Sequence, residues 1–168
     1  MRGLIVFIAV ALTALAFTAA PAAAEEVSIE HLGLELTANL EIAGGKSLRN
    51  ENVVLLVHDT LAHGRVELMA ALQDGLRDVG MSSLAITLGL GLNRRHGMFD
   101  CSLEQDHRHE DAVDEISVWV QWLKEKGVGS ITLAGHGRGA NQVALYAINR
   151  LDKAVKRVVL ISPMMETE

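Results

Sequence analysis

A turn with three alternating glycines constrains this chain more than any other feature of its sequence. The apolar run 131–134 precedes the turn and predicts a short buried strand, and Gly135, Gly137 and Gly139 follow it. From Asn141 onward the apolar residues recur at helical spacing. A strand and a helix joined in this way require a sharp change of backbone direction. Glycine at every second position also predicts that another segment packs closely against the turn.

The first 24 residues have the layout of a secretory signal peptide. Arg2 gives a basic start, an alanine-rich apolar stretch spans 4–20, and small residues at 22–24 precede the acidic Glu25. We therefore expect residues 1–24 to be removed and residues 25–168 to form the mature domain. This layout predicts a periplasmic or secreted protein that has no membrane anchor after cleavage.

Composition narrows the classes of partner and cofactor. The chain has 15 Lys and Arg against 21 Asp and Glu, a formal net charge of −6, which argues against nucleic acid and anionic membranes as partners. Its single cysteine, Cys101, excludes an intrachain disulfide bond, and we expect that thiol to be buried or inert. We predict no cofactor.

Hydrophobic periodicity predicts alternating strands and helices. Loose alternation over 27–43 favours two antiparallel strands at a sheet edge, and the unbroken apolar run 53–57 is typical of a central strand covered on both faces. The remaining predicted elements are helices over 65–79 and 110–126 and strands over 84–88 and 154–161. This order predicts one α/β domain, a three-layer sandwich whose mostly parallel sheet carries helices on both faces.

A polar segment, residues 89–109, interrupts this alternation and is long enough to be functional. His107 and His109, with His96 and Cys101 nearby, are of the residue types that bind metals. They also stand where a loop meets a helix, a place where histidines are commonly solvated and acids serve the helix terminus. We favour a solvated loop with helix capping and keep His107 and His109 as weak metal candidates.

The glycine turn resembles the nucleophile elbow of the α/β-hydrolase superfamily, in which a strand, the pattern Gly-x-Ser-x-Gly and a helix follow one another. Here the pattern is Gly135-His136-Gly137-Arg138-Gly139. The resemblance implies the α/β-hydrolase fold and an ancestral hydrolysis of ester or other acyl bonds by a serine nucleophile. The departure falls on the nucleophile itself, because Gly137 has no side chain to attack an acyl group.

The resemblance also implies an oxyanion hole, the pair of N–H donors that stabilises the developing negative charge in acyl transfer. The amide of Arg138 follows the nucleophile position. A second amide, near Asp59 or Thr60, is expected from the loop after the strand over 53–57. Two such donors without a nucleophile bind an anion but form no acyl-enzyme.

Members of the superfamily carry an acid and then a histidine beyond the elbow. No histidine follows His136 in this sequence, and the chain stops at what resembles the sixth strand, so the domain is predicted to be incomplete at its C-terminal end. His58 and His136 are the remaining candidates for a base, and each also has a structural interpretation. We therefore expect an exported, α/β-hydrolase-like protein that is inactive as a serine hydrolase.

Other functions fit the same residues. One is a non-catalytic binding or interaction module, with a small acyl compound as its ligand. The turn also fits the dinucleotide fingerprint through Gly135, Gly137 and Ala140, although Asp152, the acid at the expected spacing, precedes the last strand instead of following it. The apolar end of that strand, 158–161, has no predicted neighbour, which favours a homo-oligomer formed through it.

Overall fold

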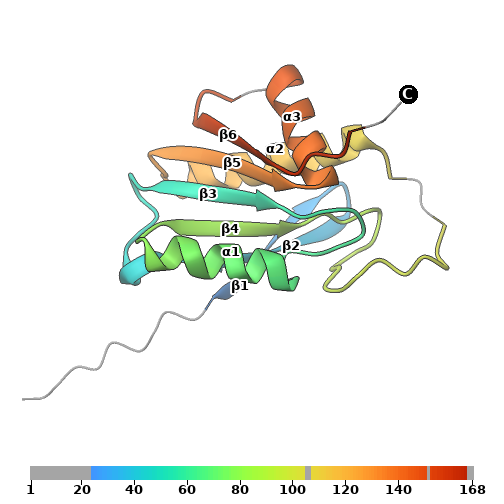
Figure 1. The fold of residues 1–168 in the computed structure, drawn as a ribbon, viewed down its shortest axis with the longest axis horizontal. Coiled ribbons are helices and arrows are strands. Elements are labelled where there is room, and N and C mark those ends of the chain that lie inside the picture. The colour runs from blue at the N-terminus through green and yellow to red at the C-terminus, as the bar shows by residue number, and fades with distance from the viewer. Residues whose placement is uncertain (1–23, 105–106, 151, 166–168) are drawn as a thin grey trace, which may run out of the picture.

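The computed structural model describes residues 24–104, 107–150 and 152–165, so nearly all of the predicted signal peptide lies outside the described residues. The described chain folds into six strands, three α-helices and one short 3₁₀ helix (Figure 1). In chain order these are β1 (Glu25–His31), β2 (Leu34–Glu41), η1 (Ala43–Gly45), β3 (Asn52–Val57), α1 (Glu67–Asp78), β4 (Ser82–Thr87), α2 (His109–Glu125), β5 (Ser130–His136), α3 (Arg138–Asn149) and β6 (Val155–Ile161).

The strands form one mixed sheet in the order β1-β2-β4-β3-β5-β6. β1 pairs with β2, and β2 with β4, in the antiparallel sense, whereas β4, β3, β5 and β6 run parallel to one another. The predicted antiparallel pair at one edge and the predicted parallel remainder are both confirmed.

Helices cover both faces of this sheet, with α1 on one side and α2 and α3 on the other (Figure 1). The side chains of β3 alternate between the two layers. Val53, Leu55 and Val57 belong to the large core that includes residues of α2 and α3, whereas Val54 and Leu56 pack in a smaller core with residues of α1. A strand buried on both faces needs an unbroken apolar run, which is what this strand has. The predicted three-layer sandwich is confirmed.

The glycines of the turn allow α3 to lie directly on the sheet. A Cβ at Gly139 would lie 2.6 Å from the carbonyl oxygen of Val57 and would also meet the carbonyl oxygen of His58. A Cβ at Gly135 would meet the backbone of Gly139. The predicted close packing is therefore present. The helix begins at Arg138, slightly before the predicted start, because Gly139, which suggested a loop, is part of its first turn.

β6 forms one edge of the described sheet. Its side chains Val158, Val159 and Leu160 are 38%, 42% and 44% exposed. The segment after it turns back over α3, where the side chain of Asn141 and the backbone of Met164 exchange two hydrogen bonds of 2.8 and 2.9 Å. Self-association through β6 stays a prediction.

Candidate functional site

The connection between β5 and α3 is a single-residue elbow. β5 ends at His136, α3 begins at Arg138, and Gly137 alone lies between them. Gly137 has φ 56° and ψ −125°, a combination that residues with a side chain rarely adopt. Its N–H donates a hydrogen bond of 3.0 Å to the carbonyl oxygen of Ile161, which ties the elbow to the end of β6. The position predicted for the missing nucleophile is therefore at the tip of a sharp turn.

The carboxylate of Asp59 reaches the elbow from the loop after β3. Its Oδ1 accepts the backbone N–H of Arg138 at 2.7 Å and the backbone N–H of Thr60 at 2.6 Å. The Thr60 hydroxyl adds a third bond, at 3.2 Å. Burial acts to raise the pKa of Asp59, but the bonds from Arg138 and Thr60 outweigh it and hold that pKa below its usual value. Asp59 is therefore an anion held by donated N–H groups.

This carboxylate stands in the space that a side chain at position 137 would need. A Cβ built on Gly137 would lie 2.6 Å from Oδ2 of Asp59 and would overlap both Cγ and Oδ1. Asp59 therefore takes the space in which a nucleophile carried by residue 137 would begin. The carboxylate fits there only because Gly137 has no side chain.

The two backbone donors predicted for the oxyanion hole, those of Arg138 and Thr60, do converge on one point. We call these two N–H groups the amide pair. The expectation for Asp59 needs correction, since the residue meets the amide pair as an acceptor, through its carboxylate, rather than supplying a donor to it. The sequence motif gives no indication of this contact, because Asp59 and Arg138 are 79 positions apart in the sequence.

His58 is a buried structural histidine. Its Nε2 accepts the N–H of Leu88 at 3.0 Å, and its Nδ1 donates to the carbonyl oxygen of Asp59 at 2.7 Å. Burial lowers the pKa of His58 to about 3, against a smaller opposing effect of the bond to Asp59. A neutral ring whose two nitrogens are both engaged is a poor general base. His136, at the end of β5, is half-buried, and its charge helps to lower the pKa of Asp59.

Arg95 connects the loops next to the site. The sequence analysis places this residue only in the polar segment 89–109. The residue is buried, and its guanidinium donates to the carbonyl oxygens of Leu88, Gly97 and Ala62, each at 2.7 Å. It also lies 3.2 Å from Nε2 of His58. Burial lowers the pKa of Arg95 to about 10. One side chain thus joins the loops that follow β3 and β4.

Glu115 is a second buried charge that the sequence analysis missed. Its Oε2 accepts the N–H of Gly89 at 2.7 Å. Burial raises the pKa of Glu115 to about 7, although the Gly89 bond and the charge of Arg95 act in the opposite direction. A signal was present, because Glu115 stands on the apolar stripe of its helix, three residues after Ala112 and four before Trp119.

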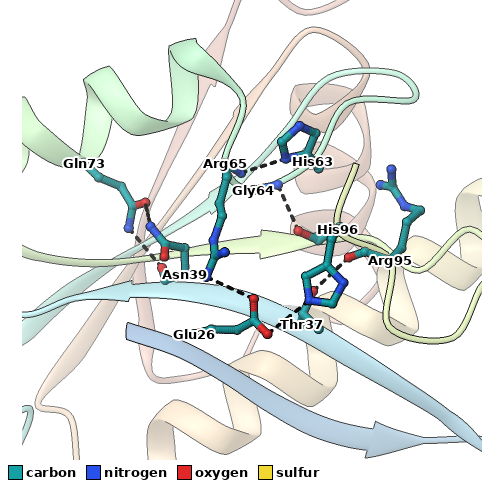
Figure 2. A network of polar contacts seen from close by, with 10 residues as sticks. Glu26, Thr37, Asn39, His63, Gly64, Arg65, Gln73, Arg95 and His96 are labelled. Atoms are coloured by element: carbon teal, nitrogen blue, oxygen red, sulfur yellow. Dashed lines mark hydrogen bonds and ion pairs between the residues drawn. The ribbon is translucent and has the colours of Figure 1, made fainter. Parts of the chain in front are cut away.

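A network of exposed polar groups joins the polar segment after β4 to the antiparallel edge of the sheet (Figure 2). Glu26 on β1 contacts Nε2 of His96 at 3.1 Å and the guanidinium of Arg65 at 3.0 Å. Thr37 on β2 donates to the carbonyl oxygen of Arg95 at 3.0 Å. The polar segment is therefore held to β1 and β2 at its residues Arg95 and His96.

A cavity of about 120 Å³ lies beside Asp59. Its apolar wall comes from Leu61, Leu88 and Leu90, and its polar wall includes Arg108 and Arg138. The arrangement can hold a small molecule with an apolar body and an anionic end.

The metal candidates form no metal site in the described part of the chain, although His107 lines the cavity beside Asp59. Among the described residues, no group of three or more His, Cys, Asp or Glu is placed to hold a metal ion. The side chain of His107 is buried, with Nδ1 3.9 Å from Asp111, and the side chain of His109 lies outside the described residues. The prediction for Cys101 is a thiol that is buried or inert. The residue is exposed on the polar segment, so burial is wrong, and an inert thiol stays a prediction.

Asp152, the acid considered for a dinucleotide site, has a different role in the structure. Its carboxylate contacts Lys124 at 2.7 Å and accepts the N–H of Ala154 at 2.7 Å. It lies before β6, whereas the elbow lies at the other end of the parallel strands. The dinucleotide alternative gains no support from this geometry.

Comparison with known proteins finds matches among solved structures. No family model and no curated protein matches the chain. Est1E from Butyrivibrio proteoclasticus is 21% identical, with a TM-score of 0.66 over 82% of this chain and 51% of that one. The α/β hydrolase GrgF from Penicillium sp. sh18 is 18% identical, with a TM-score of 0.69 over 85% and 47%. The thioesterase domain from the curacin biosynthetic pathway is 23% identical, with a TM-score of 0.65 over 87% and 48%.

The chain spans about half the length of these solved structures. None of the helices in the described part has the length and apolar character needed to cross a bilayer. The order of the strands, the elbow and these likenesses agree with one another, and the chain has the α/β-hydrolase fold that its glycine turn resembles.

Proposed function

We propose that this chain is a non-catalytic form of the α/β-hydrolase fold that binds a small acyl or carboxylate compound and performs no serine-type acyl transfer. One observation carries the proposal. The carboxylate of Asp59 fills the space of a side chain at position 137 and uses both N–H donors of the amide pair.

The proposal follows from what acyl transfer needs. A nucleophilic oxygen must be presented at the elbow, and two donors must be free to meet the oxygen that becomes negative in the transition state. Gly137 supplies no such oxygen, and the amide pair already meets Oδ1 of Asp59. His58, the nearest buried imidazole, has both nitrogens engaged. The nucleophile and the free donors are thus missing from the described site, and His58 is not available as a base.

Ligand binding is the function that the remaining geometry supports. The cavity beside Asp59 has an apolar wall and two arginines at its polar side. Sites that bind small molecules combine such apolar lining with a few placed polar groups. Among the solved structures that share the fold, one is described as ferulic acid bound to Est1E, and that chain is 24% identical to this one. An acid of that general class, apolar with one carboxylate, suits the cavity of this chain.

A direct test uses two reagents on the purified chain. A fluorophosphonate probe reports any activated serine, and p-nitrophenyl acetate reports hydrolysis of an activated ester. We expect no labelling and no hydrolysis beyond that of the heat-denatured chain. Labelling of the folded chain at a specific residue, or turnover that disappears on denaturation, would overturn the proposal.

We also propose that the protein is exported, because of its N-terminal pattern. The basic start, the apolar stretch and the small residues before Glu25 support this proposal. Expression of the full chain in a bacterium that has a periplasm, followed by fractionation and N-terminal sequencing, gives the test. A mature chain that starts at Glu25 in the periplasm is expected, whereas an uncleaved chain in the cytoplasm would contradict export.

A further inference from the structure

The two carboxylate oxygens of Asp59 are used unequally. Oδ1 accepts three hydrogen bonds, two from the amide pair and one from the Thr60 hydroxyl. No other described residue donates to this carboxylate, and no described cation forms an ion pair with it. The carboxylate is therefore held at one oxygen by backbone and hydroxyl donors, while His136 acts on it through its charge without forming an ion pair. Release of Asp59 breaks three hydrogen bonds and no ion pair.

The donors themselves are fixed by elements that do not depend on Asp59. The N–H of Arg138 belongs to the first turn of α3, a helix of 12 residues with no acidic residue in that turn. The positive end of the helix dipole therefore faces the point where Oδ1 lies. The N–H of Thr60 follows the buried strand β3, and the Arg95 guanidinium fixes the same loop through the carbonyl oxygen of Ala62. If Asp59 moved away, two aligned donors would remain.

The space next to these donors suits a second carboxylate. The cavity extends from the amide pair between an apolar wall of Leu61, Leu88 and Leu90 and a polar wall that includes Arg108. An external carboxylate would replace that of Asp59 without changing the charge at the amide pair. The apolar wall would meet the rest of the molecule.

We infer that Asp59 is a displaceable internal ligand, and that the amide pair of Thr60 and Arg138 with the adjoining cavity is a binding site for small monocarboxylic acids. The bound acid places its carboxylate on the amide pair and its apolar part against Leu61, Leu88 and Leu90. Asp59 then turns out toward solvent. This inference rests on the proposed function, because it names the ligand class of the same site.

The experiment compares Asp59→Ala with Asp59→Asn, using sodium acetate as the probe. Alanine leaves the amide pair without an acceptor, whereas the asparagine oxygen still reaches it. We expect acetate to raise the melting temperature of Asp59→Ala along a saturating curve and to shift the amide NMR signals of Thr60 and Arg138. The wild type and Asp59→Asn should bind acetate at least about tenfold more weakly, since each retains an internal acceptor.

Two controls separate a site from a salt effect. Sodium chloride at equal ionic strength and neutral acetamide should each leave the Thr60 and Arg138 signals of Asp59→Ala unchanged. Equal responses to acetate and chloride would overturn the inference, as would equal acetate affinity in Asp59→Ala and Asp59→Asn. If Asp59→Ala does not fold in buffer, its refolding yield is measured instead, and the inference fails unless acetate restores the native circular dichroism where chloride does not.

The outcomes also separate this inference from the proposed function. Absence of acetate binding together with absence of fluorophosphonate labelling removes the ligand class and leaves the chain non-catalytic. Fluorophosphonate labelling of the wild type removes the proposed function itself, whatever acetate does.

Discussion

The carboxylate of Asp59 and the Cα of Gly137 occupy adjoining positions that leave no room for a Cβ on residue 137. The two residues are separated by 78 positions in the sequence and meet only because β3 and β5 are neighbours in the sheet. The Asp59 carboxylate can keep its position only while residue 137 is glycine, and a side chain at 137 would fit only if that carboxylate moved.

Gly137→Ser should destabilise the fold without producing an esterase. The serine Cβ would collide with Asp59, and the φ of 56° is unfavourable for a residue with a side chain. Strain of this kind costs about 1–3 kcal/mol of unfolding free energy, which urea denaturation can measure. Hydrolysis of p-nitrophenyl acetate should stay at background, because Asp59 already engages the amide pair and His58 is a neutral ring with both nitrogens engaged.

Gly75→Ser is the matched control for that variant. Gly75 lies within α1, and a Cβ there would meet no atom within 4 Å. Serine has a higher helix propensity than glycine, so this variant should be as stable as the wild type or slightly more so. Esterase turnover in Gly137→Ser would contradict the prediction and would show that a histidine such as His58 or His136 serves as the base.

Because of His58, the stability of the fold should decrease as the pH falls below 6.5. Burial lowers the pKa of His58 from 6.5 to about 3, so the unfolded chain binds its proton more readily between these values. The stabilisation is therefore complete above pH 6.5 and is lost as the pH falls toward 3, by up to about 1.4 kcal/mol per pH unit. NMR of the imidazole protons gives the direct measurement. The ring should not titrate above pH 4 in the folded chain, and titration near pH 6.5 would show that His58 is not buried as described.

Glu115 should act in the opposite direction over part of the same range. Burial raises its pKa from 4.5 to about 7, so the folded chain binds the proton more readily, and the stabilisation present below pH 4.5 is lost as the pH rises through 7. Glu115→Gln mimics the protonated form and keeps an acceptor for Gly89. The variant should match the wild type near pH 4.5 and exceed its stability at pH 8.

Denaturant unfolding at several pH values measures this difference. Glu125→Gln, at an exposed position near the end of the same helix, should show no comparable dependence of the difference on pH. A constant difference between Glu115→Gln and the wild type from pH 4.5 to 8 would mean that Glu115 is ionised throughout.

Arg95→Met should destabilise the fold far more than the same change at Arg94. The Arg95 guanidinium satisfies three buried or partly buried carbonyl oxygens at 2.7 Å, and methionine would leave all of them without that donor. The expected loss is about 3 kcal/mol or more of unfolding free energy. Arg94 is exposed and pairs only with Glu35, at 3.2 Å, so Arg94→Met should change stability by less than about 1 kcal/mol. Equal losses in the two variants would contradict the assigned role of Arg95.

The sequence predicts the parts of this molecule that depend on periodicity. The unbroken run of β3, the alternation of β1 and β2, and the apolar stripe of α2 each follow from which faces are buried, and burial leaves a repeating pattern. The glycine spacing predicts the elbow because both outer glycines are required by close backbone contacts. Gly135 lies against the first turn of α3, and Gly139 lies against the end of β3.

The site is less predictable because its key contacts are single side chains that cross between loops. Asp59 and Arg95 each stand in a polar stretch where an exposed position is the usual outcome, and nothing in their neighbours marks them as buried or shared. The acceptors of Arg95 are backbone carbonyls. Every residue has one, so the sequence does not mark which of them bind Arg95. Glu115 is the exception, since a charge on an apolar stripe is visible before the structure is known.

The exposed edge of β6 leads to the last prediction, that the chain self-associates through this strand. Three consecutive apolar residues are exposed on this strand, Val158, Val159 and Leu160. The outer N–H and C=O groups of the strand have no partner strand in the described sheet. Pairing with the same edge of a second copy would extend the sheet and bury these side chains. Sedimentation at increasing protein concentration should therefore show a dimer for the wild type. Val159→Lys places a charge at that edge and should shift the chain toward monomer, whereas Val79→Lys, at an exposed position after α1, should not. A wild type that stays monomeric at all concentrations would rule out pairing through β6.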